Sequence, residues 1–269
     1  MRFLDFHCHV YPHAIAEKAS HAVAKFYEGQ WGDHSVTQPC ALQDVLHFQE
    51  EAGIEKSLIC SAATVPHQVR HINEFLARKA EQSQGRCVAF GTLHPDSPDV
   101  AGDIEHLLSL GLRGVKLHPD MQQFALDSEG AMWLYELADG QLPFLLHTGD
   151  RRFPYSNPEQ LIPVLEAFPE TTFIGAHMGG FSLWEEATEA LAGKYENLYV
   201  DLSSSMFAFT PERMVELIRA YGADRVLFGT DFPMQHPKTE VEKFLALPLT
   251  EEEKRLIAWE NGAKLLGLT

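Results

Sequence analysis

The chain has 269 residues, of which 45% are hydrophobic and 22% charged, and its formal net charge is −17. Nucleic acid is therefore a poor candidate partner, because a phosphate backbone is bound by positive surfaces. No apolar run approaches the roughly 20 residues that span a bilayer, and the N-terminus has no signal-peptide pattern, so we expect a cytoplasmic protein without membrane contact.

Short apolar, β-branched runs recur along the chain with helical patterns between them, which is typical of βα units and a parallel sheet. The runs occupy residues 2–7, 56–62, 87–93, 114–118, 143–148, 172–177, 198–203 and 225–231. Eight runs in a chain of this length predict an α/β fold, a (β/α)8 barrel, with residues 1–269 forming a single domain. A doubly wound open sheet is the alternative, weakened by the absence of G-x-G-x-x-G after the first run.

Helix start signals stand between several of these runs. Asn157, Pro158 and Gln160 provide an N-cap, a first-turn proline and a capping partner. S-x-x-E and T-x-x-E capping boxes begin at Ser182 and Thr250. Each crossover between strands is therefore predicted to contain one helix.

Extra length is concentrated after the first run. From the second run onward, strand ends are about 25 to 32 residues apart, whereas the first gap is about 53. Residues 11–40 are predicted to form a helix followed by a loop rich in glycine and aromatic residues. In a barrel, this insertion lies on the face that carries active sites and can act as a lid, with Tyr11, His13, Phe26 and Trp31 as possible wall residues.

Polar side chains collect at the ends of five of the eight runs, at the barrel face where active sites are built. These are His7 and His9, Lys116 and His118, His147, His177, and Asp231. Residues i and i+2 of a strand point to the same side, so two imidazoles at positions 7 and 9 can converge on one ion, while Cys8 points away. A packed histidine and a loop cap are the structural alternative for this pair.

The ordered motifs D-x-H-x-H, KLHPD, LLHTG, GAHMGG and FGTDFP make the chain similar to the amidohydrolase superfamily of metal-dependent barrels, specifically its amidohydrolase-related branch. The resemblance extends from Asp5 to Pro233. It implies that His7, His9, His147 and Asp231 ligate a divalent metal and that Asp231 also handles the proton of the attacking water.

The roles of His177 and Lys116 stay open at this stage. In one-metal members of the superfamily, the sixth-strand histidine is an acid/base or electrostatic group. In two-metal members, a carboxylated fourth-strand lysine bridges two ions and the sixth-strand histidine is a ligand. The resemblance therefore allows one or two ions, and Lys116 could instead be a cation for a substrate carboxylate or an oxyanion.

Substrate contacts are expected from His118, Arg151 and Arg152, since an arginine after the fifth strand could grip a carboxylate in a bidentate manner. A solvated loop charge is the alternative for the arginines, and a structural hydrogen bond for His118. The four cysteines are widely spaced, with no C-x-x-C pair, and are expected to be reduced structural thiols.

These features predict a zinc-dependent hydrolase acting on an amide, cyclic amide, ester or lactone of a small molecule. Asp231, His177 and Lys116 are its predicted catalytic groups. The alternative is a metal-dependent, non-oxidative decarboxylase of an aromatic or unsaturated acid, and a binding module without activity is a third possibility. A homodimer would be compatible with the barrel, although no segment indicates an interface.

Overall fold

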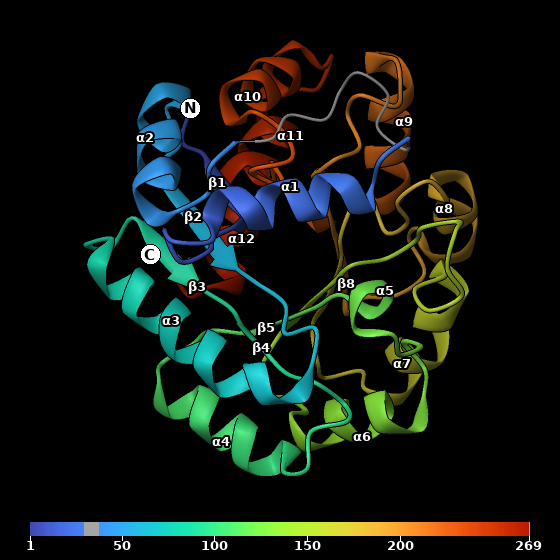
Figure 1. Ribbon diagram of the computed structural model, residues 1–269. Coiled ribbons are helices and arrows are strands. Elements are labelled where there is room, and N and C mark those ends of the chain that lie inside the picture. Colours follow the sequence, from blue (N-terminus) through green and yellow to red (C-terminus); the bar gives the residue numbers. More distant parts are fainter. Residues whose placement is uncertain (30–37, 269) are drawn as a thin grey trace.

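All eight predicted strands are present in the computed structural model, which describes residues 1–29 and 38–268 (Figure 1). The third predicted strand is interrupted at Phe90, so it is divided between two labels. The strands are β1 (Leu4–His9), β2 (Lys56–Cys60), β3 (Cys87–Ala89), β4 (Gly91–Thr92), β5 (Val115–Leu117), β6 (Phe144–Leu146), β7 (Phe173–Gly175), β8 (Leu198–Asp201) and β9 (Val226–Leu227).

The strands are parallel and follow one another around the sheet in chain order, as β1-β2-β3 and β4-β5-β6-β7-β8-β9. Backbone hydrogen bonds then join β1 to the residues that follow β9. Phe6 N donates to Phe228 O over 2.8 Å, and His9 N donates to Phe232 O over 2.7 Å. A register shift between Asp5 and Cys8 bends β1 at this junction. The predicted α/β architecture is confirmed.

The helices lie outside the strands (Figure 1). They are α1 (Ala16–Phe26), α2 (Leu42–Ala52), α3 (Val69–Gln82), α4 (Val100–Ser109), α5 (Pro119–Gln122), α6 (Glu129–Leu137), α7 (Leu161–Ala167), α8 (Trp184–Leu191), α9 (Pro211–Tyr221), α10 (Pro237–Ala246), α11 (Glu251–Arg255) and α12 (Asn261–Leu265). Among the residues described, no helix combines the length and the apolar character needed to cross a membrane.

Two of the three predicted helix starts are confirmed. The capping boxes of Asn157 with Gln160 and of Thr250 with Glu253 are both formed. The prediction for Ser182 is wrong, because α8 begins two residues later and Ser182 adopts a left-handed φ of 59°. Its hydroxyl instead accepts a hydrogen bond from the backbone N–H of Arg151.

The inner core consists mainly of strand side chains. Phe6, Leu58, Phe90, Leu145 and Ile174 belong to one buried cluster that also includes residues of the C-terminal helices. A larger cluster packs the helices onto the strands and contains Cys8, as expected from its alternation with His7 and His9. All four cysteines are buried and free.

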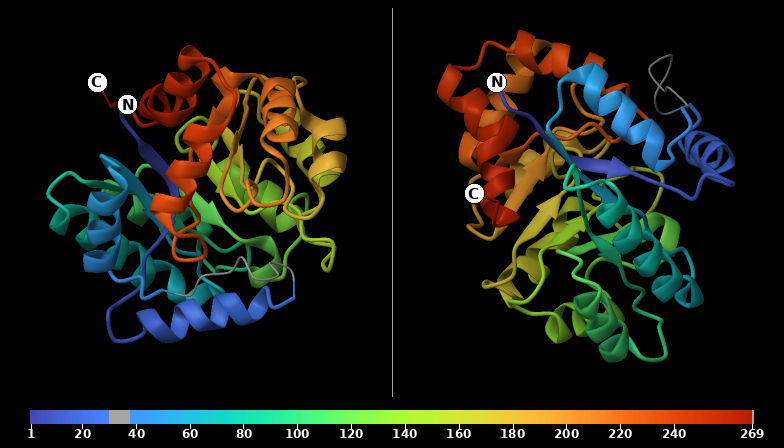
Figure 2. Two further views of the ribbon diagram at one scale, coloured as in Figure 1. Left: turned by 90° about the horizontal axis from the view of Figure 1, so that it is seen from above. Right: turned by 90° about the vertical axis from the view of Figure 1, so that its left-hand side faces the viewer.

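Helix α1 lies across one end of the barrel. The views in Figure 2 show it as an outer layer on the side opposite the two termini. Since β1 runs from the N-terminus toward α1, this is the end where the strands finish. The predicted helix of the insertion is therefore confirmed, whereas Trp31 and its predicted loop fall among residues 30–37, outside the described residues.

Candidate metal centre and active-site cavity

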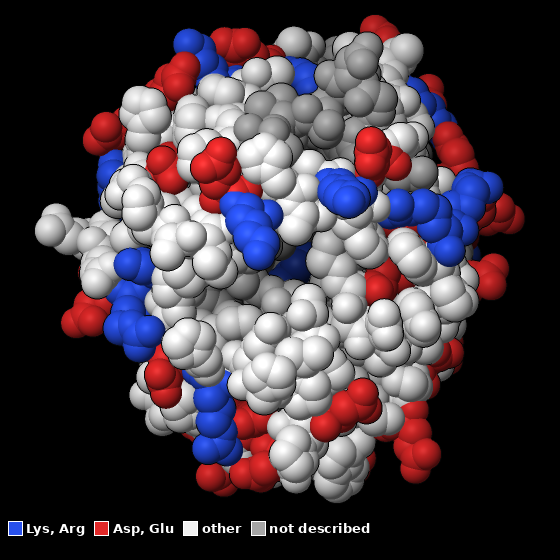
Figure 3. Space-filling view, viewed as in Figure 1, with Lys and Arg blue, Asp and Glu red and all other residues white. Residues whose placement is uncertain are grey.

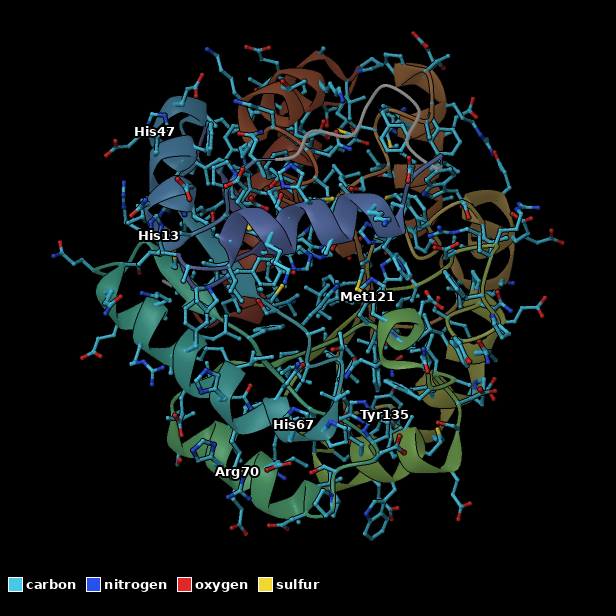
Figure 4. All side chains as sticks on the ribbon, viewed as in Figure 1. His13, His47, His67, Arg70, Met121 and Tyr135 are labelled. Atoms are coloured by element: carbon cyan, nitrogen blue, oxygen red, sulfur yellow. The ribbon has the colours of Figure 1, made fainter. Side chains whose placement is uncertain are left out.

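A cavity of about 490 Å³ lies at the carboxyl ends of the strands, beneath α1. Figure 3 shows a hollow near the centre of this face, and much of its border is uncharged. All seven strand-end residues predicted from the sequence line the cavity: His7, His9, Lys116, His118, His147, His177 and Asp231. Figure 4 shows Met121, another wall residue, near the centre of this face, whereas His13 and His47 lie toward its periphery.

His7, His9 and Asp231 form the innermost group. Asp231 Oδ1 lies 3.2 Å from His9 Nε2 and 3.6 Å from His7 Nε2. The junction between β1 and the segment after β9 sets this arrangement, because Asp231 N donates to His7 O over 2.8 Å. The second carboxylate oxygen of Asp231 accepts a hydrogen bond of 2.5 Å from Ser204 Oγ, so only one oxygen faces the imidazoles.

Asp201, at the end of β8, orients His7 from behind. Its Oδ2 lies 2.9 Å from His7 Nδ1, while its Oδ1 accepts backbone N–H groups of His177 and Ser203, each over 3.0 Å. Burial opposes ionisation of this carboxyl, but its contacts with His7 lower its pKa to about 2. An ionised Asp201 keeps the proton of neutral His7 on Nδ1, which leaves a lone pair on Nε2.

Lys116 lies against that lone pair. Its Nζ is 3.1 Å from His7 Nε2, and the side chain is buried. Burial lowers the pKa of Lys116, and burial together with the charge of Lys116 lowers the pKa of His7 to about 4. His7 is therefore neutral at physiological pH, the protonation state in which an imidazole binds a metal.

A chain of hydrogen bonds links the remaining histidines, and backbone groups at its two ends fix its direction. At one end, Met121 N–H donates to His118 Nδ1 over 3.4 Å, so neutral His118 carries its proton on Nε2. At the other end, His177 Nδ1 lies 3.0 Å from Ser203 O and 2.9 Å from Ser203 Oγ. The carbonyl can only accept and the hydroxyl donates its proton to Asp201 Oδ1, so the proton of neutral His177 lies on Nδ1 and its Nε2 carries a lone pair.

The middle of the chain follows from its ends. His147 Nδ1 lies 3.0 Å from His177 Nε2 and donates to it, which leaves a lone pair on His147 Nε2. Tyr27 OH lies between the two remaining atoms, 2.9 Å from His118 Nε2 and 3.3 Å from His147 Nε2. The phenol therefore accepts from His118 and donates to His147.

Asp120 lies beside this chain. Its Oδ2 accepts from Ser156 Oγ over 2.6 Å and is 3.5 Å from His147 Nε2, while Oδ1 has no hydrogen-bond partner among the described residues. Burial raises the pKa of Asp120 to about 7. The segment TLHPD shares the tetrapeptide LHPD with KLHPD, and its equivalent residue, Asp96, has a side chain that is 80% exposed. The tetrapeptide alone therefore does not produce a buried carboxylate.

Arg151 and Arg152 are not among the described residues that line the cavity. Arg151 binds Ser182 O and Glu186 at the surface. Arg152 forms a bidentate pair with the buried Asp150, at 2.9 and 2.6 Å, and donates over 2.6 Å to Phe26 O at the end of α1. Arg152 thus stabilises the position of α1, the helix that forms one wall of the cavity. Neither arginine contacts the predicted catalytic groups.

The donor set suits a divalent metal. His7 Nε2 and His9 Nε2 both face one oxygen of Asp231, and Asp201 orients His7 as a carboxylate behind a metal-binding imidazole commonly does. Two nitrogens and one oxygen are suitable ligands for zinc or manganese. Atoms of His118, Asp120 and His147 also lie within 4.8 Å of one another and form a second candidate metal site. In this structure, the hydroxyl of Tyr27 lies between the two imidazoles of that group and is hydrogen-bonded to both.

Three contributors to the site were not predicted from the sequence. Asp201 could have been found, because it is a carboxylate at the end of a predicted strand. Asp120 lies two positions after His118, which was predicted to contact the substrate, but no sequence pattern indicates that Asp120 is buried. Tyr27 lies 91 residues from His118 in the chain, and no local signal predicts that contact.

Known proteins similar to this chain include decarboxylases. A γ-resorcylate decarboxylase from Polaromonas sp. is 23% identical and covers 83% of this chain and 86% of its own length. The solved structure of a dihydroxybenzoic acid decarboxylase from Polaromonas sp., with bound manganese and the inhibitor 2-nitroresorcinol, has a TM-score of 0.73 at 19% identity, covering 99% and 97% of the two chains.

These findings correct one prediction and support another only in part. The relatives overturn the predicted hydrolysis of an amide, ester or lactone, because they are decarboxylases. One fold hosts many different reactions, so the residue types at the strand ends could not by themselves separate hydrolysis from decarboxylation. The choice of zinc is not supported either, since the related structure contains manganese, although a divalent metal is supported.

The fold and the family are shown independently of that reaction. An uncharacterised TIM-barrel protein from Bordetella bronchiseptica superimposes with a TM-score of 0.82 at 23% identity, covering 100% of this chain and 99% of the other. The family model described as Amidohydrolase matches residues 4–268, nearly the entire sequence. The chain therefore belongs to the amidohydrolase family, as the motifs of its strand ends imply.

Proposed function

We propose that this protein is a divalent-metal-dependent, non-oxidative decarboxylase of an aromatic carboxylic acid. The observation that carries the proposal is the position of Asp231, His7, His9 and Lys116 together at the polar end of a largely apolar cavity. The decarboxylases to which the chain is similar support this choice of reaction.

The reaction replaces a carboxylate on an aromatic ring by hydrogen. The C–C bond breaks, CO₂ leaves, and a proton forms the new C–H bond. In this proposal, His7, His9 and Asp231 hold the metal, which when bound orients the acid and withdraws electron density from it. His147 remains a predicted ligand.

Lys116 contributes the positive charge of the site. Its ammonium group is buried beside His7 Nε2 and would draw the substrate carboxylate toward this end of the cavity. Asp231 is ionised, because its contacts with His9 and His7 outweigh burial and hold its pKa well below its usual range. It would therefore first take up a proton from water in the cavity and then deliver that proton to the ring carbon, while neutral His177 adds a second polar contact. Apolar walls exclude water and favour conversion of a carboxylate into neutral CO₂.

The test is CO₂ release from 2,6-dihydroxybenzoate and related hydroxybenzoates by Mn²⁺-loaded protein, with the ring product measured in parallel. We expect equal amounts of CO₂ and product. Asp231→Asn should lower the rate of formation of both by about 10² to 10⁴, whereas Asp103→Asn, at a buried carboxylate paired with Arg70 outside the site, should retain it. A metal-loaded protein that releases no CO₂ from any aromatic acid of the panel would refute the proposal.

A further inference from the structure

The cavity is larger than a single substituted ring requires. An engineered protein cavity of about 150 Å³ accommodates benzene, whereas this one measures about 490 Å³. A ring bearing one carboxylate and two hydroxyls would occupy less than half of it. Cavities of roughly 300 to 1,000 Å³ hold larger ligands, of the size of typical drugs.

The surplus space has apolar walls. Ile15, Ala19, Ala22 and Val23 line it from the α1 side, and their spacing of four, seven and eight residues puts them on one helix face. Ile72 and Phe75 of α3 also line it. Figure 1 shows α1 in front of the barrel and α3 at its side, so this part of the wall comes from helices and not from the strands.

Charge is confined to the polar end. Among the described lining residues, Lys116 is the only lysine and no arginine occurs. The polar residues of the outer part include Ser61, Thr64 and Gln68, which are uncharged, and His71 of α3, whose side chain is exposed to solvent. A second anionic group placed there would lose hydration and would meet no lysine or arginine among the described lining residues.

We propose that the substrate is an amphiphilic aromatic monocarboxylate whose apolar extension, at least the size of a phenyl group, lies between α1 and α3. The small side chains of Ala19 and Ala22 leave the room for that extension and determine the length accepted. The assignment of the carboxylate end rests on the proposed function, whereas the assignment of the extension rests on the shape and polarity of the cavity.

Three probes with one head group test this. Mn²⁺-loaded protein is titrated calorimetrically with 2,6-dihydroxybenzoate, its 4-phenyl derivative and its 4-carboxy derivative. Burial of the added ring should lower the Kd of the phenyl probe at least tenfold relative to the parent. The 4-carboxy probe should bind no more tightly than the parent, because its second charge enters the apolar part.

Substitutions in α1 locate the extension. Ala19→Phe and Ala22→Phe each place a ring in the proposed space, so the ratio between the parent and phenyl-probe Kd values should fall from at least ten to about one. Ala14→Phe is the matched control, because Ala14 is exposed just before α1 and does not line the cavity. It should leave the ratio unchanged, and thermal unfolding confirms that each variant is folded.

The outcomes separate this inference from the reaction. Tighter binding of the phenyl probe, lost in both α1 variants, supports the inference even if no CO₂ is released, in which case only the proposed reaction fails. Equal Kd values for parent and phenyl probe, absence of binding, or an unchanged ratio in both folded α1 variants would overturn the inference. CO₂ release from the parent alone would then leave the reaction standing.

Discussion

Replacement of Asp201 by asparagine should weaken metal binding although Asp201 is not itself a predicted ligand. The carboxylate accepts hydrogen bonds on both oxygens, from His7 Nδ1 on one side and from the backbone of His177 and Ser203 on the other. An asparagine has one oxygen and one NH₂ group, so either orientation directs N–H against at least one donor. The adjustment that breaks fewest contacts moves the proton of His7 from Nδ1 to Nε2.

That proton shift removes the lone pair with which His7 would bind the ion. Loss of a comparable partner behind a metal ligand costs about 10- to 100-fold in metal affinity, which corresponds to roughly 1.4 to 2.7 kcal/mol. The Kd for Mn²⁺ of Asp201→Asn, measured by competition with a chromophoric chelator, should rise by that factor. Asp103→Asn, a buried carboxylate outside the site, is the control. A wild-type Kd in folded Asp201→Asn would refute the reasoning.

Three further results are expected. Asp231→Asn should lower kcat for CO₂ release by about 10² to 10⁴, the usual contribution of a positioned acid; full activity would eliminate its proton-transfer role. Tyr27→Phe leaves a buried donor of His118 without its acceptor and should lower the free energy of unfolding of the metal-free protein by about 1 to 3 kcal/mol in denaturant titration, and an unchanged value would contradict the hydrogen-bond chain. The same free energy should fall as pH drops from 6.5 to 4, because burial lowers the pKa of five histidines in the folded state, so unfolding takes up protons; His7, with a pKa of about 4, accounts for roughly 3 kcal/mol. Two buried carboxyls, Asp5 and Asp120, have pKa values raised to about 7 and therefore release protons on unfolding, which opposes this trend with fewer protons. A net gain in stability between pH 6.5 and 4 would show that the histidines are not held neutral.

Much of the framework was predictable because strand and helix periodicity is local. The eight runs appear as strands, and the polar residues at their ends meet in one cavity because parallel strands of a barrel finish on one side. The start of α8 was not predictable, since a left-handed turn at Ser182 depends on its contact with Arg151. A capping pattern contains no information about such tertiary contacts.

The site was predictable in its residue types but not in its connections. His118 and His94 occupy identical H-P-D contexts, yet only His118 lines the cavity. The arginines after β6 were expected to face the substrate, whereas Arg152 is held by Asp150 and the end of α1. Whether a side chain at a strand end faces substrate or supports another element depends on neighbours that are distant in sequence.

The hydrogen-bond chain from Met121 to Ser203 has a consequence for how the cavity can be altered. Both ends are backbone groups whose roles as donor and acceptor cannot be exchanged, so the chain exists in one direction only. Reversal at any imidazole would create a mismatch on each side of it. His118, Tyr27 and His147 therefore behave as one unit under substitution, with strongly non-additive effects. A substitution at one of these residues therefore needs matching substitutions at the others to keep every donor paired with an acceptor. Sequence changes are for that reason harder to accommodate in this part of the cavity than in the apolar wall of α1.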